Sequence, residues 1–285
     1  MGKIFVFDAA KCNGCHCCQV ACKDEHCDMA WPPYAQAQPD TGQFWMKVSE
    51  KVRGQVPKVC VSYSVHGCMH CSNAPCMAVA KDNAVYRRDD GLVIIDPEKA
   101  VGQKQIVEAC PYEAVFWNEE LSLPQKCTGC AHLLDDGWSI PRCVEACPTE
   151  ALRFGAREDF ADELADAVVL DAKPGTGPDP DLNADLNPEP NFYYLNLPKR
   201  FIGGEVYDQE ADEVLIGAQI TLSKDGEIVG VTESDDFGDF WFKQIEPALY
   251  TVSLEMEGYM TRSKEADVTE EDLNIGSIAL YETLD

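Results

Sequence analysis

The pattern of hydrophobic and polar positions changes character twice along the chain. Over about the first 150 residues, short apolar runs such as KIFVFD (3–8) and GLVIID (91–96) predict short strands. A helical pattern follows at about residues 159–170, and residues 172–191 are then rich in Pro, Gly and Asp, which is typical of a linker. From about residue 200, apolar and polar positions alternate with period two, which predicts strands.

The alternating segments after residue 200 are separated by turn signals. The stretch AQITLSKDGEIVGVTES (218–234) predicts a hairpin around Asp225-Gly226. Three more strand patterns follow, in GDFWFKQI (238–245), LYTVSLEME (249–257) and IGSIALY (275–281). Together they predict a small all-β sandwich, and they resemble the prealbumin-like, carboxypeptidase-regulatory type of immunoglobulin-like module. The segment has no Cys and no His, so we expect a structural or interface role rather than ligand binding.

The predicted fold class is therefore α+β, with an irregular cysteine-rich domain followed by an all-β sandwich. We expect the boundaries at residues 1–171 for the first domain, 172–199 for an acidic Pro/Gly-rich linker, and 200–285 for the sandwich. A chain of 285 residues is long enough for two such domains.

Charge is spread unevenly over these parts. Residues 1–150 have a net charge of −5, residues 151–285 have −22, and the whole chain has −27. Such a field repels phosphates, so nucleic acid is not an expected partner. The sequence contains no run of about 18 apolar residues, so no membrane-spanning helix is predicted. The start MGKIFVFDAAKC resembles a strand rather than an export signal, so we expect a cytoplasmic location unless an exported partner carries the chain along.

All fifteen cysteines lie between Cys12 and Cys147. Disulfide frameworks are typical of short secreted domains, whereas these cysteines are closely and regularly spaced, so metal binding is the better interpretation. They form four runs: Cys12-x2-Cys15-x2-Cys18-x3-Cys22, Cys68-x2-Cys71-x4-Cys76, a run reduced to Cys110, and Cys127-x2-Cys130-x12-Cys143-x3-Cys147.

The first run has the spacing of [4Fe–4S] ligands, and Cys110 and Cys147 are each followed by proline, as the last ligand of such a run is. Zinc is the alternative for any two C-x2-C pairs. However, four closely set thiolates would crowd a single tetrahedral ion in the first run. The sequence therefore favours iron–sulfur clusters.

The last cysteine of each run ligates the cluster of a partner run, so the runs pair. The second run has Ala80 where its last ligand would fall, and the third has Ala100, Gln103 and Ile106 in place of its first three. If these two runs are partners, the four absences remove one cluster and leave three complete ones. The predicted ligand sets are Cys12, Cys15, Cys18 and Cys147 for cluster 1; Cys127, Cys130, Cys143 and Cys22 for cluster 2; and Cys68, Cys71, Cys76 and Cys110 for cluster 3.

Several other side chains lie near these ligands in the sequence. Cys17, Cys27 and Cys60 remain outside the sets and are expected to be packed or free thiols. His16, His70 and His132 flank ligands and are candidates for hydrogen bonds to cluster sulfur, with a packing or surface role as the alternative. Lys126 is expected to be solvated on an exposed loop, although it is placed to offset cluster charge. Trp45, Trp117 and Trp138 are expected in the core rather than as electron relays.

Four ferredoxin-type runs with a long gap in the fourth resemble the iron–sulfur subunits of the dimethyl-sulfoxide-reductase superfamily of molybdopterin enzymes. Within that superfamily, the organisation is most similar to small subunits of the pyrogallol–phloroglucinol transhydroxylase type, which pair a three-cluster ferredoxin-like domain with an immunoglobulin-like domain. The stretches that carry the resemblance are KCNGCHCCQVACKDEH (11–26), GLVIIDPEKA (91–100), ACPYEAVFWNEE (109–120) and QKCTGCAHLLDD (125–136).

This resemblance implies that residues 1–171 form a double ferredoxin-like domain of the four-run type with one cluster lost. It also implies an electron-transfer subunit without an active site of its own. Its partner, in a heterodimer or a multiple of it, would be a large catalytic subunit with molybdopterin-bound Mo or W that acts on aromatic polyols, by hydroxyl transfer or dehydroxylation. The alternatives are the iron–sulfur subunit of another reductase of the superfamily, such as a catechol dehydroxylase, and a free-standing ferredoxin-like carrier.

Overall fold

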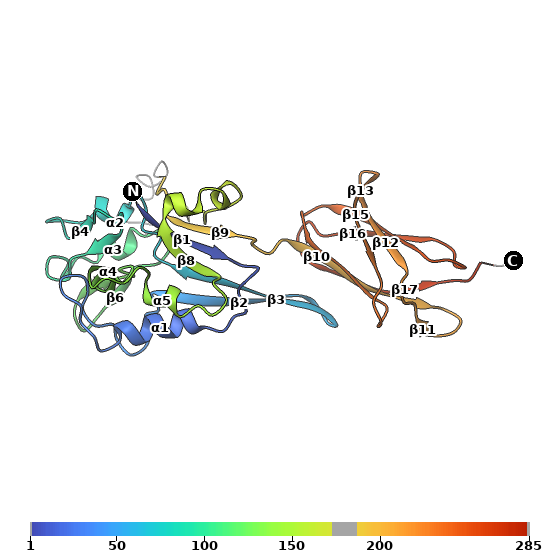
Figure 1. Ribbon diagram of the computed structural model, residues 1–285, viewed down its shortest axis with the longest axis horizontal. Coiled ribbons are helices and arrows are strands. Elements are labelled where there is room, and N and C mark those ends of the chain that lie inside the picture. The colour runs from blue at the N-terminus through green and yellow to red at the C-terminus, as the bar shows by residue number, and fades with distance from the viewer. Residues whose placement is uncertain (1, 173–186, 284–285) are drawn as a thin grey trace. The chain divides into compact units, whose positions relative to one another are not determined.

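The structure is a computed structural model that describes residues 2–172 and 187–283. The chain divides into two compact units (Figure 1): Met1–Glu50 with Tyr63–Leu197, and Lys51–Ser62 with Pro198–Asp285. Most of the expected linker, residues 173–186, lies outside the described residues. The second unit includes the stretch Lys51–Ser62, which lies within the predicted bounds of the first domain.

The first unit contains a three-stranded sheet. Strand β1 (Lys3–Asp8) pairs antiparallel with β8 (Leu152–Ala156) and parallel with β9 (Phe192–Leu195). The predicted strands in KIFVFD and GLVIID are confirmed as β1 and β5. The elements between β1 and β8 in sequence are α1 (Cys17–His26), β2 (Met46–Gln55), β3 (Lys58–Gly67), α2 (Pro75–Ala78), β4 (Val85–Arg87), β5 (Val93–Ile95), α3 (Gln105–Glu108), β6 (Phe116–Asn118), β7 (Leu123–Gln125), α4 (Ala131–Asp135) and α5 (Arg142–Glu145), and the Lys51–Ser62 part of β2 and β3 belongs to the second unit.

Both faces of β1 are covered, and the alternation of its side chains decides what each face meets. Ile4 and Val6 pack in a small cluster with Phe160. Phe5 and Phe7 face the main core, where Phe5 stacks on Phe192 with ring centroids 5.3 Å apart. The buried cysteines belong to this same core, so the sheet forms one wall of the region that holds them.

The prediction of a helix at residues 159–170 is wrong. The structure has two short 3-10 turns there, η1 (Arg157–Phe160) and η2 (Glu163–Ala165). Beyond them, Val168 exchanges two backbone hydrogen bonds with Tyr194, at 2.9 and 2.8 Å, in an isolated bridge. The bridge holds the chain extended, and so long-range pairing outweighs a local helical pattern that is short and marginal by itself.

The second unit contains two four-stranded sheets. Buried side chains from both sheets, among them Val206, Ile220, Phe240 and Val252, share one core, as expected for a sandwich. The first sheet has β10 (Arg200–Asp208), β11 (Glu213–Val214), β14 (Asp239–Ile245) and β17 (Leu273–Leu280); the second has β12 (Gln219–Lys224), β13 (Glu227–Glu233), β15 (Leu249–Glu255) and β16 (Arg262–Asp267).

The hairpin predicted around Asp225-Gly226 is confirmed. Strands β12 and β13 pair antiparallel, with Lys224 opposite Glu227. Asp225 and Gly226 have φ angles of 52° and 85°. Two successive positive φ angles are those of a type I′ turn, whose twist matches that of the flanking strands.

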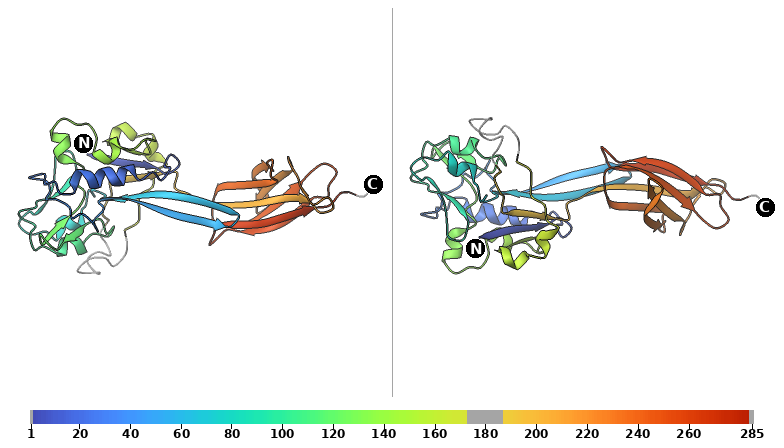
Figure 2. Two further views of the ribbon diagram at one scale, coloured as in Figure 1. Left: turned by 90° about the horizontal axis from the view of Figure 1, so that it is seen from below. Right: turned by 90° about the horizontal axis from the view of Figure 1, so that it is seen from above.

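Strands β2 and β3 form a two-stranded ribbon (Figure 2), and the Lys51–Ser62 part of it belongs to the second unit. Arg53 donates to both carboxylate oxygens of Asp272, at 2.8 and 2.6 Å, and both side chains are more than nine-tenths buried. Lys58, also buried, forms an ion pair with Asp239. Two ion pairs therefore fix this stretch to the sandwich.

No helix among the described residues is long and apolar enough to cross a membrane.

Candidate metal centres

In three of the four C-x2-C pairs, the backbone turns at the residue before the second cysteine. Gly14, His70 and Gly129 occupy this position with φ angles of 70°, 42° and 64°. The left-handed region is open to glycine and costs other residues about 1–2 kcal/mol. A side chain at Gly129 would also meet Leu92, because an added Cβ would lie 2.7 Å from its Cδ1 atom. The loops are thus shaped by local geometry that tolerates little change.

We expect the Gly129→Ala variant to bind less iron than the wild type, because the strained loop and the contact with Leu92 displace Cys127 and Cys130. Gly137→Ala is the matched control, since Gly137 also has a positive φ, 96°, but an added Cβ there meets nothing within 4 Å. Iron per chain and the midpoint of thermal unfolding are the measurements. Equal iron content in the two variants would contradict a specific role of the Gly129 loop.

The four cysteines predicted for cluster 1, here called site 1, lie together. Burial raises the pKa of Cys18 to about 12, with contributions from Cys147, Cys12 and Cys15. Cys12 is likewise influenced by Cys147 and Cys15. Site 1 is the most accessible of the three, because Cys15 is exposed and Cys12 and Cys147 are half-buried.

Site 2 contains Cys22, Cys127, Cys130 and Cys143, all buried. Burial raises the pKa of Cys143 well above its ordinary value, and Cys22, Cys130 and Cys127 raise it further. Helix α1 supplies Cys22, α5 supplies Cys143, and these two helices pack against each other. Ligands 121 positions apart in sequence are thereby brought to one place by a helix pair.

Site 3 contains Cys68, Cys71, Cys76 and Cys110. Burial raises the pKa of Cys71, and the other three cysteines of the site raise it further. The same grouping holds for Cys76, whose pKa is raised to about 12 by burial first and by Cys68 and Cys110 among its neighbours. Cys110, the lone cysteine of the third run, therefore lies with the second run.

Site 2 neighbours both other sites. The charge of Cys18, from site 1, contributes to the raised pKa of Cys22 and Cys143. On the other side, the charge of Cys68, from site 3, contributes to the raised pKa of Cys127. The three sites thus form a series in which site 2 lies between site 1 and site 3.

The spacing of the sulfur atoms bears on the kind of metal. Among the described residues, the one group of three or more His, Cys, Asp and Glu side chains with ligand atoms within 4.8 Å of one another is Cys27, Asp28 and Asp40. None of the twelve cysteines belongs to it. A tetrahedral zinc ion with bonds of about 2.3 Å needs sulfur atoms only about 3.8 Å apart. No three of the twelve sulfur atoms lie within 4.8 Å of one another, and this wider spacing is compatible with a four-iron cluster, which fills a larger space.

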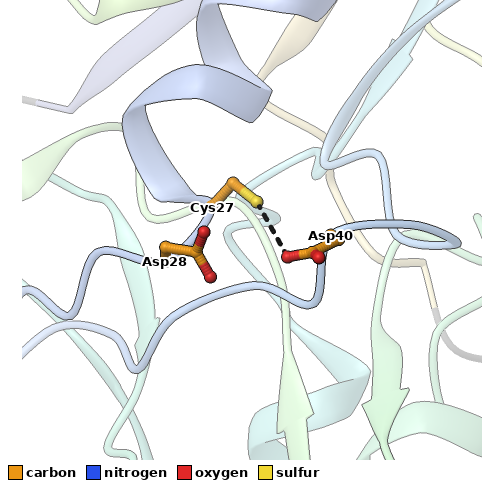
Figure 3. Close-up of side chains that lie close together, drawn as sticks. All are labelled: Cys27, Asp28 and Asp40. Carbon is orange, nitrogen blue, oxygen red and sulfur yellow. Dashed lines mark hydrogen bonds between the residues drawn. The ribbon is translucent and has the colours of Figure 1, made fainter.

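Figure 3 shows the group outside the three sites. The thiol of Cys27 points toward Asp40 and lies 3.6 Å from its Oδ1 atom, and the Asp28 carboxylate lies beside them. Cys27 follows α1 directly, and its thiol is accounted for by this contact.

Two further observations test whether the three sites suit an anionic cluster. First, backbone N–H groups donate to cysteine sulfurs: Gly129 to Cys127 at 3.3 Å and Ala114 to Cys110 at 3.4 Å. Such bonds stabilise thiolates and tune cluster potentials. Second, the C-x2-C loops contain two buried polar atoms without a partner among the described residues, His70 Nε2 and Thr128 Oγ1. Buried donors are rarely left unsatisfied, so both fit a site that holds an additional acceptor.

The positions where a fourth cluster's ligands would fall lie next to one another. Gln103 accepts a hydrogen bond from the backbone of Lys81, beside Ala80, at 2.8 Å, and its amide donates to Lys99 O at 2.9 Å. Ala100 and Ile106 are fully buried in the main core. A hydrogen-bonded glutamine and two apolar side chains thus occupy this place.

The Gln103→Leu variant is expected to lose about 0.5–1.5 kcal/mol of unfolding free energy, because part-buried hydrogen bonds to the backbone of Lys81 and Lys99 are lost. Its iron content should equal that of the wild type, since Gln103 is not a ligand. Urea unfolding and iron analysis measure the two effects. A fall in iron content without a change in stability would contradict the conclusion that Gln103 stabilises the fold and is not a ligand.

The histidines divide into three kinds. His16 is half-buried, and His132 stacks on Trp31 and lies 3.0 Å from Glu25, so His132 has a packing and pairing role. His70 is buried, and its Nδ1 accepts from Val93 N at 3.0 Å. Sequence reasoning missed His26, which is 1% exposed with Nε2 3.8 Å from Cys130 Sγ. No spacing signal identifies it, because 104 positions separate the two residues.

Burial lowers the pKa of His26 to about 3, with His132 lowering it further, so the ring is neutral. A neutral imidazole next to Cys130 can donate one hydrogen bond to sulfur without adding charge.

The expectations for Lys126 and Trp138 are wrong. Lys126 is 3% exposed rather than solvated, because it lies between β5 and the loop of site 2. Trp138 is 40% exposed rather than in the core, whereas Trp45 is buried and Trp117 half-buried. Cys17 is exposed beside Cys15, and Cys60 is half-buried in β3.

Comparison with known proteins assigns both parts of the chain. Residues 59–157 match the family of 4Fe-4S dicluster domains, and residues 202–280 match the carboxypeptidase regulatory-like domain. The small subunit of pyrogallol hydroxytransferase from Pelobacter acidigallici is 36% identical over 284 residues, which cover 96% of this chain and 98% of that protein.

Other relatives match a smaller share of the chain. A subunit of tetrathionate reductase from Salmonella typhimurium is 31% identical over 69% of this chain and 73% of its own length. One polypeptide of the anaerobic dimethyl sulfoxide reductase from Escherichia coli is 30% identical over 58% of this chain and 79% of its own length.

Proposed function

Because this protein belongs to the family of iron–sulfur electron-transfer subunits of molybdopterin oxidoreductases, we propose that it carries three [4Fe–4S] clusters and relays electrons for a large catalytic partner. That partner holds molybdopterin-bound Mo or W. The observation that carries the cluster number is the arrangement of twelve cysteines in three groups of four, next to a fourth place occupied by Gln103 and apolar side chains.

When bound, each [4Fe–4S] cluster accepts and releases one electron. The chain's own residues hold, orient and surround the clusters. The proposed ligands are Cys12, Cys15, Cys18 and Cys147 at site 1; Cys22, Cys127, Cys130 and Cys143 at site 2; and Cys68, Cys71, Cys76 and Cys110 at site 3. Backbone N–H groups donate to the ligating sulfurs, the His26 ring lies against Cys130 at site 2, and burial keeps water from that site.

The proposed substrates of the complex are aromatic polyols, on which the partner catalyses hydroxyl transfer or dehydroxylation. The similarity to the pyrogallol hydroxytransferase small subunit supports this choice, because it extends through both units and over nearly the full length of that protein. The reductase subunits named above match less of the chain. Substrate chemistry belongs to the partner, and we propose a cytoplasmic location for the complex.

The test is isolation of the native complex through an affinity tag on this chain, without oxygen. We expect a large subunit to copurify, with Mo or W present, and the complex to convert pyrogallol to phloroglucinol. Conversion of catechol alone, or of tetrathionate or dimethyl sulfoxide, would instead support another reductase of the superfamily. A monomeric chain with all its clusters and without a copurifying subunit would favour a free-standing carrier.

A further inference from the structure

Lys126 is buried beside two of the proposed clusters. Its side chain is 3% exposed, and buried lysines are rare because removing an ammonium from water is costly. Among the residues that the structure describes, no carboxylate lies within ion-pair distance of it. Its charge must therefore be compensated by other groups.

The backbone fixes the position of the ammonium group. Lys126 Nζ donates to the carbonyl of Val93, in β5, and to the carbonyl of Cys127 at 3.0 Å. The N–H of the same Val93 donates to His70 Nδ1 at 3.0 Å. One strand residue thus holds both Lys126 and His70, and Lys126 cannot move away as a surface lysine would.

The compensating groups are thiols of two different sites. Lys126 directly precedes Cys127 of site 2, and Val93, to whose carbonyl Lys126 donates, also holds the ring of His70, which lies between Cys68 and Cys71 of site 3.

We propose that Lys126 is a fixed cation shared by sites 2 and 3, which raises the reduction potentials of the clusters at both sites relative to that at site 1. The inference rests on the proposed function. Reduction adds one negative charge to a cluster, and a positive charge held nearby in a region of low dielectric constant stabilises the reduced form. Electrons entering the chain of clusters would then rest at sites 2 and 3 in preference to site 1.

The test is a redox titration of the complete complex, followed by electron paramagnetic resonance, in Lys126→Met and Lys126→Gln variants. Both remove the charge; methionine keeps the unbranched shape, and glutamine keeps a hydrogen-bond donor. Lys126→Arg retains the charge, and Lys104→Met, at an exposed lysine, is the matched control. Iron content is measured in every sample.

We expect two of the three couples to shift to lower potential in both neutral variants, by at least a tenfold change in the reduction equilibrium, which is about 59 mV for one electron. The third couple should stay in place, and Lys126→Arg and Lys104→Met should resemble the wild type. Three unchanged couples, or three equal shifts, would overturn the proposal. Loss of iron from both neutral variants would also overturn it, because Lys126 would then be needed for assembly. Failure of the proposed function would be recognised separately, because the wild-type protein itself would then not contain three clusters.

Discussion

Replacing Cys143 with alanine is expected to lower the iron content from about 12 to about 8 atoms per chain, because a [4Fe–4S] cluster needs four thiolates. Cys143 is 3% exposed and lies among Cys22, Cys127 and Cys130. Iron and acid-labile sulfide analysis measure the loss, and one of three low-temperature paramagnetic signals should disappear.

Cys17→Ala is the matched control for this prediction. Cys17 lies in the first run and interacts with Cys15, but it falls outside the ligand spacing. Its removal should leave the iron content at the wild-type value. A Cys143→Ala protein with full iron, or a Cys17→Ala protein that loses a cluster, would show that the ligand sets are wrong.

Replacing Asp272 with alanine is expected to lower the unfolding free energy of the second unit by about 3–5 kcal/mol, since it leaves the buried guanidinium of Arg53 without its carboxylate partner. Asp272 also accepts the N–H of Phe201 at 3.0 Å, so that donor is orphaned as well. The measurement is urea unfolding of the full chain, read by hydrogen exchange in peptides from residues 51–62 and 198–283.

Glu246→Ala provides the comparison. It breaks the ion pair with Lys199, in which both side chains are more than half exposed, and exposed pairs contribute at most about 1 kcal/mol. If the two variants are equally stable, the Arg53–Asp272 pair does not hold the stretch Lys51–Ser62 to the sandwich in the way the structure indicates.

Local signals predicted much of the fold. KIFVFD has the apolar run of a covered strand, and Asp225-Gly226 has the composition of a type I′ turn; both predictions depend on neighbouring residues alone. The helix expected at residues 159–170 did not form because Val168 pairs with Tyr194, in strand β9 within the segment expected to be a linker. A pairing partner so distant leaves no trace in a local pattern.

The residues of the candidate sites also differ in whether the sequence could predict their positions. Spacing groups the cysteines within each run, and the rule that paired runs exchange their last ligand supplies the long-range pairing. The groups around Cys147 and Cys110 in the structure follow that pairing, and the ligand assignment stays a prediction until iron is measured. No comparable rule predicts that His26 and Lys126 lie near the ligands. Their roles arise from burial against Cys130 and Val93, which only the folded chain places near them.

The most direct test of the central claim is the number of iron and acid-labile sulfide atoms in the wild-type complex, purified without oxygen and corrected for the molybdopterin partner's own iron. Three [4Fe–4S] clusters predict about 12 iron and about 12 sulfide atoms per copy of this chain. A reproducible value near 16 would contradict the loss of the cluster at Ala80, Ala100, Gln103 and Ile106, and a value near 8 would contradict one of the three sites.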